Sequence, residues 1–329
     1  MPKNIIITCA EGQTGHLIAE QILTNDQFSQ DVSVHLFSCN PEHPHVQELA
    51  KMGDHVNVVE CTPGDPKKLE QQFKDSGADG IVLIPPSVDN KLECVEEMAM
   101  ATKGAGIQSV VLISAAGCDV AEKDKQPRVR EFIEIEHMMM KMKGEPETGD
   151  AGHSQAIIRA GFYAENLLLY NKYAKDKGKL PLPIGDKHKF APIALGDIAL
   201  LAAHTITSEG EHGLGDHVRG QLMTLTGDEG PMMTAGEELA DAASQGLGTN
   251  MEYEDISEED AVELLKEAEI SESEKEYLLQ YYSLVREGKL NYISTHCFHD
   301  VLGEHPMEMT DFFKSYAEEF KPKKRKTSS

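Results

Sequence analysis

The sequence has no long hydrophobic run and no paired cysteine motif. Nothing in its 329 residues approaches the roughly 20 consecutive apolar residues of a membrane-spanning helix, and the short β-branched run after Asn4 cannot form the core of a signal peptide. The six cysteines include no C-x-x-C pair, and His296, Cys297 and His299 lack a second ligand group at zinc-like spacing. We therefore expect no membrane segment, no metal site, and free thiols in a reducing compartment.

Positive charge is also scarce. The chain carries 31 Lys and Arg residues against 56 Asp and Glu residues, a formal net charge of −25. A body this acidic repels phosphate backbones, so direct binding of nucleic acid is not expected. The exception is the segment 321–329, which contains five cations and no acidic residue: Lys321, Lys323, Lys324, Arg325 and Lys326.

This segment predicts a disordered basic tail, for which two interpretations stay open. It has the form of a short nuclear-import signal that binds an import receptor, or it is a solvated end that offsets an acidic body. The protein is accordingly expected in the cytoplasm, and also in the nucleus if the tail is an import signal.

Strand-like and helix-like segments alternate in the first half of the chain. Apolar, β-branched runs predict strands, with helices between them, at the following residues: strands 4–8, 32–37, 56–60, 80–84, 109–114 and 155–159; helices 14–24, 45–52, 66–76 and 89–105. Strands separated by helices of this length form βαβ units. We therefore predict an α/β fold with a Rossmann-type doubly wound parallel sheet over residues 1–160.

The pattern changes after this domain. Ser257 and Ser271 each begin an S-x-x-[D/E] capping signature, which predicts the start of an amphipathic helix. We predict a smaller α+β C-terminal lobe over residues 161–320, interleaved with the first domain, and a loop at residues 144–152. A protein partner is expected to bind through this lobe.

A short β-branched strand leads into Gly12 and Gly15, and an amphipathic helix follows. This is the phosphate-binding turn of a dinucleotide fold, in which the diphosphate approaches bare backbone at a helix N-terminus. Cys9 stands where the first glycine of the usual G-x-x-G-x-x-G spacing belongs, and the Glu11 carboxylate is expected beside the diphosphate. We therefore expect NADP or NAD to bind weakly or not at all, through these residues: Ala10, Glu11, Gly12, Gln13, Thr14 and Gly15.

Several stretches spread over nearly the whole chain resemble one family. They are, in family order, Ala10–Gly15, Val110–Gly117, Arg159–Asn166 (similar to R-P-G-x-F-x-x-N), Gly196–Ala199, Leu225–Gly227, the helical region 252–288, and His305-Pro306 before Phe312-Phe313. On these motifs the chain resembles the NmrA-like proteins, which are atypical extended short-chain dehydrogenases. The resemblance implies a Rossmann domain carrying NAD(P), with a smaller lobe over the nicotinamide end. It also implies that relatives include redox-sensing regulators and quinone or ketone reductases.

The cofactor site departs from this family pattern at the end of the second strand. Cys39 stands where the family has an Arg that grips the 2′-phosphate of NADP. No Asp replaces it to hold the ribose of NAD, so the sequence does not choose between the two cofactors. Cys39 and Pro85, which follow the second and fourth strands, are expected at the cofactor with Ser114 at the end of the fifth strand.

The sequence also departs from the family pattern at the two catalytic positions. Short-chain dehydrogenases use Y-x-x-x-K, in which the Tyr donates a proton and the Lys lowers its pKa. An alignment anchored on Glu136, taken as the acidic residue four positions after that Lys, places Arg128 and Phe132 at the Tyr and Lys positions, and neither can replace them. A shift by one turn instead brings His137 and Lys141 into an H-x-x-x-K arrangement, where Lys141 replaces the missing Lys; the alternative is that Lys141 lies on a solvated helix face. Ser114 is expected to hydrogen-bond a substrate carbonyl, or else to satisfy backbone at the strand end.

Three functions stay open. A regulatory or redox-sensing protein with degenerate cofactor and catalytic motifs is favoured, because losses accumulate at both phosphate-facing and catalytic positions. An NAD(P)H-dependent quinone or ketone oxidoreductase is the first alternative, since hydride transfer to a quinone needs little proton donation by a dedicated Tyr. The second alternative is a structural or interaction protein that no longer binds a cofactor.

Overall fold

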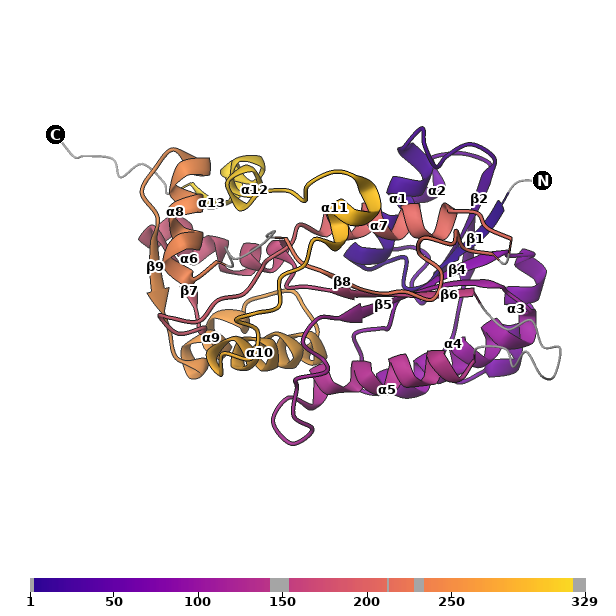
Figure 1. The fold of residues 1–329 in the computed structure, drawn as a ribbon, viewed down its shortest axis with the longest axis horizontal. Helices are drawn as coiled ribbons and strands as arrows, with labels where there is room; N and C mark the ends of the chain where they lie inside the picture. Colours follow the sequence, from indigo (N-terminus) through magenta and orange to yellow (C-terminus); the bar gives the residue numbers. More distant parts are fainter. Residues whose placement is uncertain (1–2, 143–153, 212, 228–233, 322–329) are drawn as a thin grey trace. The chain divides into compact units, whose positions relative to one another are not determined.

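Seven strands form one sheet in the order β3-β2-β1-β4-β5-β6-β8 (Figure 1). They are β1 (Lys3–Ile7), β2 (Val32–Ser38), β3 (Val56–Glu60), β4 (Gly80–Leu83), β5 (Ser109–Ala115), β6 (Ser154–Ala160) and β8 (Leu222–Leu225). β1 pairs in parallel with β2 and β4, so that Ile5 lies opposite Val34 on one side and Gly80 on the other. β2–β3 and β4–β5 are also parallel. The predicted doubly wound parallel sheet is confirmed.

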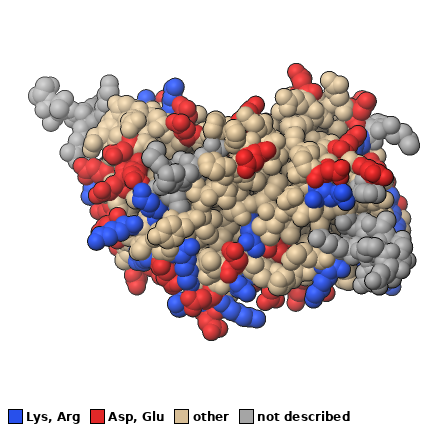
Figure 2. All heavy atoms as spheres, in the orientation of Figure 1, with Lys and Arg blue, Asp and Glu red and all other residues tan. Residues whose placement is uncertain are grey.

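The computed structural model describes residues 3–142, 154–211, 213–227 and 234–321. The predicted loop at 144–152 and the basic tail after Lys321 lie outside these residues. In the part of the chain that is described, no helix is both long and apolar enough to span a membrane. On the face that Figure 2 shows, Lys and Arg side chains are scattered among acidic ones, as the sequence composition leads one to expect.

The chain divides into two compact units that interleave along the sequence. The first unit comprises Met1–Ala115, Glu131–Arg159 and Gly196–Thr224, and the second comprises Ala116–Arg130, Ala160–Leu195 and Leu225–Ser329. One change of unit falls between Arg159 and Ala160. The segment 196–224 returns to the first unit, because it contains most of strand β8, which lies at one edge of the large sheet.

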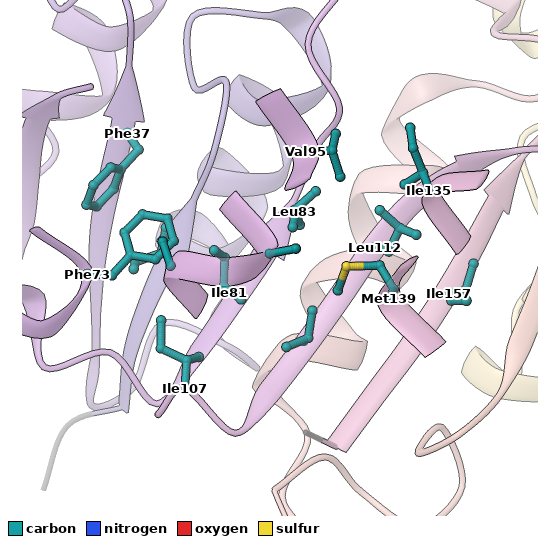
Figure 3. Close-up of a cluster of buried hydrophobic side chains, with 14 residues drawn as sticks. Phe37, Phe73, Ile81, Leu83, Val95, Ile107, Leu112, Ile135, Met139 and Ile157 are labelled. Carbon is teal, nitrogen blue, oxygen red and sulfur yellow. The ribbon is translucent and has the colours of Figure 1, made fainter. Parts of the chain in front are cut away.

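Helices cover both faces of the sheet in the first unit (Figure 1). α1 (Gln13–Thr24), α2 (Pro44–Ala50) and α7 (Leu195–Thr207) lie on one face, and α3 (Pro66–Ser76), α4 (Lys91–Ala105) and α5 (Pro127–Lys141) lie on the other. Every residue of β4 and β5 is buried, as expected for strands covered on both sides. Beneath the second face, Phe73 meets Phe37 edge-on with ring centroids 4.9 Å apart, and Met139 packs in the same cluster (Figure 3).

The second unit is built from short elements around aromatic side chains. β7 (Lys179–Leu182) and β9 (Glu252–Asp255) form a two-stranded parallel sheet. The helical elements are η2 (Ala164–Tyr170), α6 (Asn171–Lys177), α8 (Gly236–Leu247), α9 (Glu258–Leu265), α10 (Glu272–Arg286), α11 (Cys297–Leu302), α12 (Met309–Ser315) and α13 (Ala317–Phe320). The predicted caps are confirmed: Ser257 accepts the Asp260 N–H at the start of α9, and Ser271 accepts the Glu274 N–H at the start of α10.

Candidate functional site

The turn from β1 to α1 lies where the strand order of the sheet reverses, because β1 stands between β2 and β4. Parallel sheets of this kind bind ligands outside the carboxyl ends of the strands at such a switch point. Cys9 in this turn has φ of 51°, the left-handed region that ordinarily favours glycine. Its Sγ donates a hydrogen bond to the Ile84 carbonyl at 3.3 Å, and the Gly12 N–H donates to the Cys9 carbonyl at 3.0 Å. Cys9 therefore adopts a backbone conformation that suits the glycine it replaces.

The two retained glycines meet different constraints. A Cβ at Gly15 would lie 2.5 Å from the Cys9 carbonyl oxygen, so α1 can pack against the turn only with glycine there. A Cβ at Gly12 would lie 3.4 Å from the same oxygen, which the fold tolerates. Gly12 is the N-cap of α1, no side chain caps the helix, and its first turn holds no acidic residue. The backbone here offers N–H groups and a positive helix end to an anion.

A cavity of about 390 Å³ opens beside the turn, entirely within the first unit. Residues that follow β1, β2, β3 and β4 contribute to its wall, so it lies at the carboxyl edge of the sheet. Phe37, Leu69, Phe73 and Met98 make part of this wall apolar, as in pockets that receive a flat ring. Among the described residues that line the cavity, none is Lys or Arg.

Glu11 also lines the cavity, and its carboxylate is turned toward the end of β2. Its Oε1 accepts the Cys39 N–H at 3.3 Å, while its Oε2 is buried without a hydrogen-bond partner. The Glu11 carbonyl meanwhile lies 3.0 Å from His45 Nδ1. In the structure this carboxylate lies at the carboxyl end of β2, next to Cys39, and its predicted position beside a diphosphate stays a prediction.

The residues predicted to contact a cofactor fall into three groups. Glu11, Gly12 and Cys39 line the cavity. Gln13, Thr14 and Gly15 form the first turn of α1, and the buried Ala10 donates its N–H to a carbonyl of β2. Pro86 lies in the described wall where the sequence predicted Pro85, and Ser114 lies on β5 outside this wall.

Thiols are a feature of the cavity that the sequence analysis missed. Cys9, Cys39, Cys61 and Cys94 all line it, and Cys39 Sγ lies 3.8 Å from Cys61 Sγ. A hydrogen bond with Cys61 lowers the pKa of Cys39, whereas burial raises the pKa of Cys9 and of Cys94. Cys39 and Cys61 directly follow two neighbouring parallel strands. Their positions at the ends of two strands would have predicted the thiol pair if the order of the strands in the sheet had been known from the sequence.

Ser114 belongs to a buried network that joins β5, α5 and β6, outside the described wall of the cavity. Its hydroxyl donates to Glu136 Oε1 at 2.5 Å. Arg159 donates from Nε and Nη2 to the two oxygens of the same carboxylate, at 2.8 Å each. The Glu136 side chain is 2% exposed and that of Arg159 is 12% exposed. A buried carboxylate held by a bidentate guanidinium is a strong, geometrically fixed contact. The Ser114 hydroxyl therefore holds β5 to α5.

The other residues at the predicted catalytic positions on α5 either make structural contacts or are exposed. Within the second unit, the Arg128 N–H and Nε donate to Gln280 and Glu276. Within the first unit, the Phe132 ring lies 4.6 Å below Lys91 Nζ. Lys141 is exposed at the end of α5, toward the amino edge of the sheet, because a crossover helix returns the chain to that edge. The structure does not bring Lys141 to Ser114, and its catalytic role stays a prediction.

The fold and the turn match a known family. The model of the NmrA-like family matches residues 1–313. The chain belongs to this family. Among curated relatives, quinone oxidoreductase 2 of Escherichia coli (strain K12) is 27% identical over 263 residues, which are 80% of this chain and 81% of that protein. An NAD(P)H azoreductase of Xenophilus azovorans is 24% identical over 243 residues, 73% of this chain and 77% of that protein.

Solved structures share the fold of this NmrA-like protein. The NADPH-dependent quinone oxidoreductase of Escherichia coli complexed with NADPH has a TM-score of 0.75 at 23% identity, covering 95% of this chain and 99% of that one. NmrA, a negative transcriptional regulator solved in complex with NADP, has a TM-score of 0.71 at 14% identity, covering 95% and 94%. Similarity at these identities shows the fold, and function is argued from the site.

Proposed function

We propose that this NmrA-like protein is a dinucleotide-binding regulatory protein that senses redox state. The observation that carries the proposal is the network of Ser114, Glu136 and Arg159. A carbonyl reductase would offer the Ser114 hydroxyl to its substrate, whereas here that hydroxyl is buried and donates to a carboxylate. The backbone of the dinucleotide turn is kept, while the Ser114 hydroxyl, predicted to act on a substrate, makes a structural contact and Lys141 is exposed at the end of α5.

The residues at the end of β1 fit an NAD(P)-type dinucleotide. The bare backbone at Gly12 and the start of α1 suit a diphosphate. The apolar wall of the cavity suits an adenine ring, and the orphaned Glu11 Oε2 suits a hydrogen-bond donor. A nicotinamide dinucleotide, when bound, supplies hydride chemistry. We expect a dissociation constant weaker than about 1 μM, because backbone N–H groups hold the anion and no Lys or Arg stands in the described wall.

A quinone oxidoreductase is the second candidate. The relationship to quinone oxidoreductase 2 at 27% identity, over most of both chains, favours it. A quinone accepts a hydride without a dedicated protein acid, so the absence of a Tyr/Lys pair on α5 does not exclude this activity.

Turnover separates the two candidates. Oxidation of NADH and NADPH is followed with a panel of quinones, azo dyes, aldehydes and ketones, with and without protein. A regulator binds the dinucleotide and leaves its oxidation at the background rate. Robust quinone reduction that Lys141→Ala abolishes would instead establish the reductase and restore a role for Lys141. Ser114→Ala is the matched control. On this proposal the variant loses stability and binds the dinucleotide as the wild type does.

The proposal extends to where the regulator acts. We expect a protein partner at the second unit, and import into the nucleus through an import receptor bound to residues 321–329. A fluorescent fusion with and without these residues tests the second point in a eukaryotic cell. Nuclear enrichment of the full chain alone supports an import signal. Identical cytoplasmic distribution of both fusions leaves the tail as a solvated end.

A further inference from the structure

Glu11 places a half-satisfied carboxylate at the carboxyl end of β2. One oxygen is anchored on the Cys39 N–H, and the other is buried without a partner. In dinucleotide folds, an acidic residue about 20 residues after the glycine turn hydrogen-bonds the 2′-hydroxyl of the adenosine ribose. Cys39 occupies that region of this chain and carries no carboxylate. The glycine turn itself therefore supplies a carboxylate to the end of β2.

The surroundings of this carboxylate are acidic. Glu97 lines the same cavity and accepts the Gly64 N–H at 2.9 Å. Two imidazoles near the turn contact backbone: His45 Nδ1 lies 3.0 Å from the Glu11 carbonyl, and His16 Nδ1 lies 3.3 Å from the carbonyl of His45. Among the described residues of the wall there is no Lys or Arg to receive a phosphate. The Oε2 atom of Glu11 would accept a hydrogen bond from a hydroxyl group and would repel a second anion.

We infer that Glu11 binds the adenosine ribose, and that the site therefore binds NAD(H) more tightly than NADP(H). The carboxylate accepts the hydrogen of the ribose 2′-hydroxyl once the Glu11 side chain turns its Oε2, which is covered in the free protein, into the cavity. A 2′-phosphate at the same place would meet the Glu11 and Glu97 carboxylates without a compensating cation. This inference rests on the proposed binding of a nicotinamide dinucleotide, and it adds a direction of selectivity that the sequence alone left open.

Two effects set the expected selectivity. A hydrogen bond to a charged group stabilises binding enough to change a dissociation constant by about 10-fold or more. Repulsion between a phosphate and a carboxylate about 4 Å apart adds a further factor of about 5 even at the dielectric of bulk water. We therefore expect NADH to bind at least about 10-fold more tightly than NADPH.

Nucleotides that lack the nicotinamide half isolate the adenosine end. ADP, 2′-deoxy-ADP and adenosine 2′,5′-bisphosphate are titrated calorimetrically into the full chain, beside NADH and NADPH. In the wild type, ADP is expected to bind about 10-fold more tightly than 2′-deoxy-ADP, and the bisphosphate most weakly. This comparison needs no variant and so does not depend on the folding of one.

Variants assign the effect to Glu11. In Glu11→Ala, ADP falls to the affinity of 2′-deoxy-ADP, and the 2′,5′-bisphosphate binds about 5-fold more tightly than to the wild type. Glu97→Gln is the matched control, since it removes a carboxylate from the same cavity and should keep the preference for ADP over 2′-deoxy-ADP. Circular dichroism and melting curves verify that each variant is folded.

The outcomes separate this inference from the proposed function. Equal binding of ADP and 2′-deoxy-ADP by the wild type, or a preference for ADP that survives in Glu11→Ala, overturns the role of Glu11 while dinucleotide binding stands. A preference for NADPH overturns the role in the same way. Absence of binding by every adenine nucleotide overturns both the site and the proposed function.

Discussion

Replacing Arg159 with Met should strongly destabilise the first unit. Arg159 makes two 2.8 Å hydrogen bonds to Glu136, whose side chain is 2% exposed, and Ser114 supplies a third donor. Without the guanidinium, a buried carboxylate keeps only the Ser114 hydroxyl among these three contacts. Breaking one side of a buried ion pair typically costs about 3–5 kcal/mol, so we expect a loss of this size in the free energy of unfolding.

The assay is urea unfolding followed by circular dichroism, because the sequence contains no tryptophan to report unfolding by fluorescence. Arg219→Met is the matched control. Arg219 Nη2 lies 2.9 Å from Asp216, but both side chains are well exposed, so the same substitution should cost less than about 1 kcal/mol. The double variant Glu136→Leu/Arg159→Met removes both buried charges and should recover much of the stability.

Two results would refute this reasoning. If Arg159→Met costs no more than Arg219→Met, the network does not hold β5 to α5. If the double variant is less stable than Arg159→Met alone, the loss does not come from an uncompensated carboxylate. The first result would also weaken the case for a regulator, because that case assumes that the network fixes the Ser114 hydroxyl.

Three further predictions concern the turn, the thiols and pH. Gly15→Ala should lower the free energy of unfolding by about 1–3 kcal/mol, because its Cβ meets a carbonyl oxygen at 2.5 Å; urea unfolding measures this. Cys39 is exposed and its pKa is lowered by the neighbouring thiol, so iodoacetamide should label it first, and NADH should slow that labelling; peptide mass spectrometry reads both rates. Burial, with His217 nearby, lowers the pKa of His204, so the folded state binds fewer protons there than the unfolded state. The melting temperature should therefore fall as pH drops through about 6.5, and less steeply in His204→Asn.

The fold followed from local patterns in the sequence. The alternation of β-branched runs and helical segments predicted the parallel sheet, and the spacing of Gly12 and Gly15 predicted the turn at its switch point. These signals are local, since each strand, helix and cap is encoded within a few residues. Ser257 and Ser271 predicted two helix starts for the same reason.

The site was harder, because its chemistry depends on contacts between distant residues and on side-chain direction. Ser114 contacts a residue 22 positions away, and no local pattern shows that its hydroxyl is committed there. The Glu11 carboxylate accepts a hydrogen bond from Cys39, 28 positions away, and no local pattern predicts that contact. The thiols of Cys39 and Cys61 meet only because β2 and β3 are neighbours in the sheet.

The central claim, that the β1–α1 turn binds an NAD(P)-type dinucleotide on bare backbone, is tested most directly by titrating NADH into the wild type and Gly12→Ala. The added Cβ would lie 3.4 Å from the nearest carbonyl oxygen, so the variant should fold and melt like the wild type, while its methyl group obstructs the diphosphate. We predict saturable binding at a single site in the wild type and at least about 10-fold weaker binding in Gly12→Ala. Equal affinity in the two proteins, or no binding by the wild type, would contradict the account.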